Sequence, residues 1–171
     1  MANTYTLIAS NTLSSSAASV TFSSIPATYT DLVLRCSTRR DGGSFASLFF
    51  RVNGSTGTNF STTYLQGDGA TATSLRATSV NRFNIYDVVP GPTQTSNTFN
   101  SVEIYVPNYT AIQNKPMSGF GVGETNATTA YILAQAGLRS VTDAITSIEL
   151  LPAGGNFVSG SSFFLYGIKN S

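Results

Sequence analysis

Two glutamates are the residues of this chain that could combine to do chemistry. Glu103 and Glu149 each lie in a short apolar, β-rich stretch, and neighbouring strands can bring such side chains together. Glycoside hydrolysis needs only two carboxyl groups at a suitable separation. Glu103, however, alternates with Val102 and Ile104, which predicts a side chain directed to solvent or to an interface. We interpret Glu149 as an edge or subunit contact, and we expect no enzymatic activity.

The sequence offers little other catalytic chemistry. It contains no histidine, the residue that most often serves as general base and as a nitrogen ligand for metals. It also lacks a Gly-x-Ser-x-Gly nucleophile turn, a phosphate-binding Gly-x-x-x-x-Gly-Lys loop and a Gly-x-Gly-x-x-Gly dinucleotide motif. We predict no cofactor and no metal.

A few polar and aromatic residues are candidates for contact with another protein. Arg35, Arg39 and Arg40 form a local basic cluster, which marks either the end of a strand or an anchor for an acidic protein surface. Tyr64 belongs to a set of tyrosines suited to a receptor-binding surface or a subunit interface. Asp68 stands between two glycines, which indicates a turn more than a calcium ligand. We take these five residues as the predicted contact set.

Composition limits the other partners. The net charge is +1 and the nine Lys and Arg residues are dispersed, unlike the clustered basic face of nucleic-acid-binding proteins. No apolar run approaches the ~18 residues of a membrane span. The start carries no signal-peptide pattern, so we expect synthesis in a cytoplasm. The single cysteine, Cys36, is predicted to be a buried apolar residue.

The elements expected to position these residues are short strands. Charged residues make up 10% of the chain, whereas residues with β propensity are frequent. Runs of alternating or continuous apolar residues predict strands at 5–9, 19–22, 31–37, 45–52, 62–66, 81–88, 99–106, 117–122, 130–137, 148–151 and 163–168. This spacing predicts one all-β domain over residues 1–171, an antiparallel, jelly-roll-like β-sandwich built from about eight to ten of these eleven stretches. Ser140–Ala144 is the one candidate for a short helical turn.

The sequence also makes specific predictions for one turn, one loop and the two ends of the chain. Asn53-Gly54 predicts a tight β-hairpin after the strand at 45–52. Residues 55–78 are mostly polar and are interpreted as a long surface loop containing one edge strand around 62–66. Residues 1–18 are predicted to form an extended N-terminal strand or an arm that lies on a neighbour. The strand at 163–168 is apolar on both faces, as expected in the interior of a sheet.

The two ends of the chain resemble small jelly-roll structural proteins of tailed bacteriophages. The residues that carry the resemblance are 5–9, 148–151, 156–157, 159–161 and 164–168. The resemblance implies a virion component at the head surface, and we expect a decoration or cement protein that binds the major capsid protein as a homotrimer. The alternative is a tail-associated fibre or adhesin module that binds host-surface carbohydrate.

Overall fold

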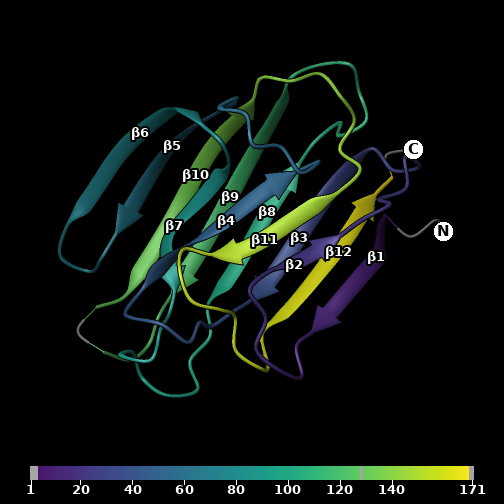
Figure 1. The fold of residues 1–171 in the computed structure, drawn as a ribbon. Coiled ribbons are helices and arrows are strands. Elements are labelled where there is room, and N and C mark those ends of the chain that lie inside the picture. The colour runs from purple at the N-terminus through teal and green to yellow at the C-terminus, as the bar shows by residue number, and fades with distance from the viewer. Residues whose placement is uncertain (1–3, 128, 170–171) are drawn as a thin grey trace.

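The protein is a sandwich of two antiparallel β-sheets. The computed structural model describes residues 4–127 and 129–169. These residues form twelve strands and no helix, and the strands lie in two layers (Figure 1). The predicted all-β sandwich is confirmed, with more strands than the eight to ten expected.

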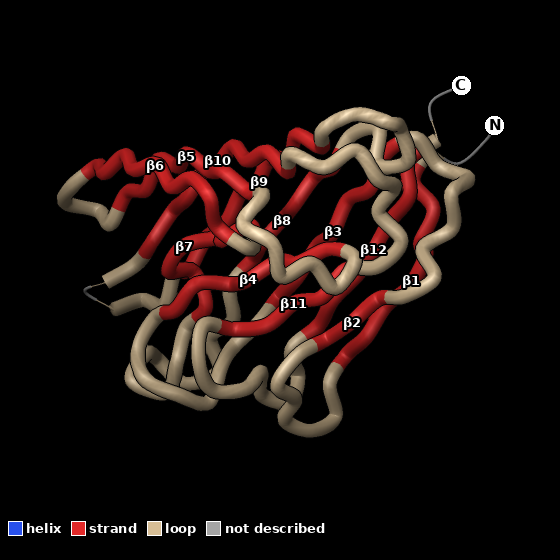
Figure 2. The backbone as a smooth tube through the Cα atoms, turned by 45° about the horizontal axis from the view of Figure 1, so that its top comes forward, coloured by secondary structure: helices blue, strands red, loops and turns tan. Residues whose placement is uncertain are grey.

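The two sheets differ in width. In spatial order, the larger consists of β1 (Tyr5–Thr12), β12 (Ser162–Ile168), β3 (Asp31–Ser37), β8 (Ser101–Val106), β9 (Lys115–Gly123), β10 (Tyr131–Arg139), β5 (Phe60–Gly67) and β6 (Ala72–Val80). The smaller consists of β2 (Val20–Phe22), β11 (Ile148–Pro152), β4 (Ala46–Val52) and β7 (Phe83–Val89). The eight-stranded sheet is therefore only partly covered by the four-stranded one (Figure 2).

Alternating apolar residues on the facing strands build one hydrophobic core. In β12, Phe163 and Leu165 point inward and are fully buried, as are Leu48 and Phe50 of β4. Alternate residues of a strand project to opposite faces, so the same pattern leaves every second residue on an outer face. Strand β12 lies between β1 and β3, which confirms the prediction of an interior strand.

The Asn53-Gly54 turn forms, but the predicted hairpin is wrong. Both residues have positive φ, and the N–H of Ser55 donates to the carbonyl of Val52. The chain then crosses to the other sheet, where it enters β5. The Asn53 side chain explains the departure: its Oδ1 accepts from the N–H of Thr146 at 2.8 Å, which ties the turn to the segment before β11.

The predicted loop over 55–78 is also corrected. It contains all of β5 and most of β6, which form a two-stranded hairpin joined by a turn at residues 68–71. Strand β5 is paired on both sides, with β10 and β6, so the edge strand is β6. Strand β6 was not predicted because seven of its nine residues are exposed and it lacks a buried apolar face.

Two further expectations change. Residues 5–12 form a strand, β1, but it pairs with β12 of the same molecule, so this part is not a free arm. Residues 1–3 of the predicted arm lie outside the described residues. Ser140–Ala144 forms no helical turn; the Asp143 carboxylate instead accepts hydrogen bonds from Arg139 and Asn53, which tie the segment to the end of β10 and to the turn after β4.

Candidate functional site

The outer face of the eight-stranded sheet is the candidate binding surface. The strand register aligns one row of outward side chains across the whole sheet: Ser10, Phe164, Arg35, Glu103, Phe120, Ala134, Leu65 and Ser74. The residues beside them in sequence, such as Leu34, Ile104 and Leu133, are buried in the core. The row therefore belongs to the solvent-facing side.

An ion pair occupies the centre of this row. Arg35 Nε donates to Glu103 Oε2 at 2.8 Å across β3 and β8, and both side chains are about half exposed. Among the described residues, this is the protein hydrogen bond that each side chain makes. The Nη groups of Arg35 and the second oxygen of Glu103 thus remain available to a ligand.

Aromatic rings surround the ion pair. Phe164 and Phe120 flank it in the same row, and the Tyr5 ring lies 6.0 Å from the Arg35 guanidinium carbon, within reach of a cation–π interaction. On the Phe120 side, the ion pair borders a shallow hollow of about 440 Å³ lined also by Ser101 and Val102. The arrangement combines a flat apolar ring, two charged groups and a hydroxyl.

On the other side of Phe120 the surface becomes apolar. Leu65, Phe120 and Ile132 are 56%, 50% and 52% exposed, although all three are large hydrophobic residues. Together with Ala134 and Ala72 they line a second hollow of about 230 Å³. We call Leu65, Phe120, Ile132 and Ala134 the apolar strip; it spans β5, β10 and β9 on the outer face of the sheet, next to the β6 edge.

The predicted arginine cluster does not act as a unit. Arg35 faces outward in β3, whereas Arg39 donates to the carbonyls of Gly91, Gln94, Thr95 and Thr98 and so holds the loop after β7. Arg40 donates to the carbonyls of Ser44, Ala153 and Gly154. Both guanidinium groups thus fasten loops within the molecule, which agrees with the strand-end interpretation.

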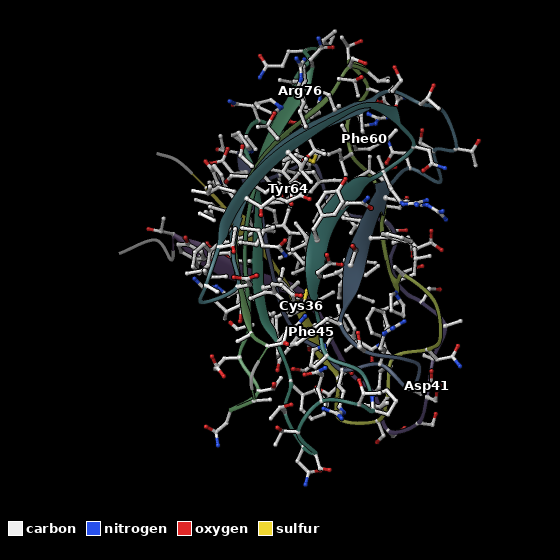
Figure 3. All side chains as sticks on the ribbon, turned by 90° about the vertical axis from the view of Figure 1, so that its left-hand side faces the viewer. Cys36, Asp41, Phe45, Phe60, Tyr64 and Arg76 are labelled. Atoms are coloured by element: carbon white, nitrogen blue, oxygen red, sulfur yellow. The ribbon has the colours of Figure 1, made fainter. Side chains whose placement is uncertain are left out.

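The other two predicted contact residues differ in exposure. Tyr64 points between the sheets, is 7% exposed and stacks on Tyr86 with 4.2 Å between ring centroids (Figure 3). Burial raises the pKa of its hydroxyl. Asp68 is exposed at the tip of the hairpin, where the N–H groups of Thr71 and Ala70 donate to its carboxylate and lower its pKa. Tyr64 is therefore a core residue and Asp68 caps a turn.

The two glutamates do not converge. Glu103 belongs to β8 of the larger sheet, while Glu149 belongs to β11 of the smaller one and lies 3.5 Å from Arg51. No group of three or more Asp, Glu or Cys side chains in the described residues could hold a metal ion. The described residues likewise include no helix suited to crossing a membrane.

Sequence reasoning missed the apolar strip, although the sequence holds a signal for it. In β9, Met117, Gly119 and Gly121 are inward, so Phe120 is out of phase with the buried residues. In β10, Ile132 precedes the fully buried Leu133, and only one of two adjacent apolar residues can face the core. Large apolar residues out of phase with their strand therefore mark the exposed patch.

The fold and surface define a β-sandwich protein with an open, partly apolar sheet face. No family model matches the chain, and no curated protein is similar to it. Among solved structures, the chain is similar to galectin LEC-6 of Caenorhabditis elegans, with 13% sequence identity, a TM-score of 0.43 and 95% of each chain covered. This likeness does not identify a family.

Proposed function

We propose that the protein is a non-enzymatic structural component of a phage virion, a decoration protein that binds the major capsid protein at the head surface as a homotrimer. The observation that carries the proposal is the apolar strip, because large exposed apolar patches mark surfaces that another protein covers. The low charge of the chain and its resemblance to phage jelly-roll proteins support this placement.

On this proposal the apolar strip is the capsid-facing surface. Its side chains come from three adjacent strands that are each paired on both sides, so they are presented without ordering a loop on binding. Each contact is modest, but the repeated sites of a capsid lattice multiply the total binding free energy when subunits are linked in trimers.

Co-sedimentation with undecorated capsids tests the proposal. The wild-type protein is expected to behave as a trimer in light scattering and to pellet with capsids, whereas Ile132→Ser should reduce pelleting at least tenfold. Ile112→Ser is the matched control, since Ile112 is 92% exposed in the turn before β9, outside the strip. Absence of wild-type binding, or equal binding by both variants, contradicts the proposal.

A second candidate, carbohydrate binding by a tail-associated adhesin module, is favoured by the ion pair and its aromatic neighbours. A pyranose ring has an apolar face that packs on an aromatic ring, and its hydroxyl groups accept from a guanidinium and donate to a carboxylate. Phe120, Arg35 and Glu103 offer these groups around one hollow.

Matched substitutions on the two outer faces test this candidate. Titration calorimetry with cellotetraose, maltotetraose and chitotetraose should detect binding that Glu103→Gln and Phe120→Ala weaken at least tenfold. Glu149→Gln and Phe49→Ala make the same changes on the smaller sheet, where Glu149 also pairs with an arginine and Arg82 lies over the Phe49 ring. No binding of any tetrasaccharide at millimolar concentration counts against the candidate.

A further inference from the structure

Strand β6 is a free sheet edge. It is hydrogen-bonded to β5 on one side only and ends the eight-stranded sheet. Strand β5 still packs against β7, whereas β6 extends past it, so the smaller sheet does not cover β6 (Figure 2). Every second backbone N–H and C=O group along β6 therefore points outward, without a partner strand.

The edge of β6 lacks most of the features that normally prevent pairing with another strand. Its nine residues contain no proline, no lysine and no acidic residue, and Arg76 is the one charged side chain. Its register with β5 is continuous over six residues, from Ala72 to Ala77, and shifts once near the end of the strand, between Ala77 and Val80. The opposite edge strand, β1, is interrupted by an irregularity between Leu7 and Ala9. Strand β6 is thus the more regular edge for pairing.

Leu75 identifies the partner that this edge fits. It pairs with the buried Tyr64 on β5, yet Leu75 itself is 54% exposed because the smaller sheet ends before it. Its neighbour Arg76 projects to the opposite face with Thr63. An incoming strand should therefore offer an apolar residue opposite Leu75 and a residue without positive charge opposite Arg76.

We propose that β6 pairs antiparallel with β6 of a second copy, about a two-fold axis at Leu75. This register places Leu75 against its own counterpart and Arg76 against Ser74 of the other copy. A two-fold axis at Arg76 would place two guanidinium groups opposite each other, which is unfavourable. The strand is thus complementary to itself, and two eight-stranded sheets join into one continuous sheet.

The expected strength of this contact is modest. One added strand pair buries less area than the roughly 800 Å² per partner of a stable interface, so the β6-linked dimer, whether of single chains or of trimers, should depend on protein concentration. The inference goes beyond capsid binding, because it concerns two copies of this chain alone. On a capsid lattice, the same two-fold contact would link neighbouring trimers.

Cysteine crosslinking of the purified protein tests the register. The chain has one native cysteine, Cys36, which is buried. Directly opposed residues of antiparallel strands have Cα atoms about 4.5–5.5 Å apart, within the range that a disulfide requires. Leu75→Cys should form a covalent dimer under mild oxidation at least tenfold faster than Thr73→Cys, which would face Ala77, or Ile112→Cys, which lies elsewhere on the surface.

A charge substitution provides a second readout. Leu75→Lys places two ammonium groups opposite each other, and it should lower the dimer fraction in sedimentation equilibrium, whereas Ile112→Lys should not. Both positions are exposed, so neither change threatens folding. Equal crosslinking rates for the three cysteine variants, or a dimer fraction unaffected by Leu75→Lys, would overturn the proposal. Because no capsid is present, these outcomes are independent of the capsid-binding test.

Discussion

Arg139 and Asp143 form an ion pair in which the arginine is almost fully buried and the aspartate about half exposed. Arg139 ends β10 and points inward beside Lys115 of β9, its direct partner in the sheet. Asp143 thus supplies the negative charge near two buried cations. Hydrogen bonds from Arg139 hold the pKa of the Asp143 carboxyl below its usual range, despite the opposing effect of burial.

The pH dependence of stability should reveal this ion pair. A carboxyl group whose folded-state pKa is depressed stabilises the protein above its unfolded pKa of ~3.9, and this stabilisation is lost as the pH falls through the folded pKa. Asp143→Asn should lower the free energy of unfolding at pH 7 by about 1–3 kcal/mol, less than for a fully buried pair because Asp143 is half exposed. Urea denaturation between pH 7 and pH 2.5 should show this difference shrinking.

Asp87 provides a comparison with Asp143, because the pKa of its carboxyl group is raised and not lowered. Burial raises the pKa of its carboxyl group, so the charged form costs stability at neutral pH. The free energy of unfolding of Asp87→Asn should therefore increase relative to that of the wild type as the pH rises. Identical pH profiles for the two variants would contradict both assignments.

The sequence predicted the strands that bury an alternating face and missed the strand that does not. Asp31–Ser37 was predicted with its observed bounds because Leu32, Leu34 and Cys36 alternate with outward residues. Strand β6 has no such pattern, since its pairing depends on β5 and not on the core. The local sequence pattern also could not predict which sheet the chain enters after Asn53. That choice depends on hydrogen bonds with residues 144–147, which are distant in the sequence.

The contact residues were harder to predict for a related reason. Charged residues are natural candidates for contacts with a partner. The guanidinium groups of Arg39 and Arg40, however, donate to carbonyls of loops far along the chain. Whether an arginine is free depends on the tertiary structure. Arg35 remained a surface residue because its strand position directs it outward, opposite Glu103.

Lys115 should be essential for stability although it belongs to no proposed binding surface. Its side chain is fully buried, and Nζ donates to the carbonyls of Ala111, Gln113 and Thr142 at 2.6, 2.5 and 3.4 Å. Lys115→Met keeps most of the volume but removes the charged donor from all three carbonyls, of which that of Ala111 keeps the N–H of Gln113; the change should cost about 2–4 kcal/mol of unfolding free energy. Lys169→Met, at an exposed position, should change stability by less than ~0.5 kcal/mol.

Cys36 should not react with thiol reagents in the folded protein. It is buried in the core, and burial raises the pKa of its thiol, so the reactive thiolate is suppressed. Ellman's reagent should therefore titrate no thiol under native conditions and one thiol per chain in denaturant. Rapid reaction of the native protein would show that β3 is not packed as described.

Gly137 should not tolerate alanine, because Phe83 occupies the space where a Cβ would lie. A Cβ at Gly137 would be 2.4 Å from Cε2 of Phe83, a fully buried ring of β7 that packs across β9 and β10. Gly137→Ala should lower the midpoint of urea denaturation by the equivalent of about 1–3 kcal/mol, since either the ring or the strand must move. Gly57→Ala is the matched control: its Cβ would meet no atom closer than 3.6 Å, and its φ is not positive. If both variants unfold at the same denaturant concentration as the wild type, the close packing of β7 against β10 is not required for stability.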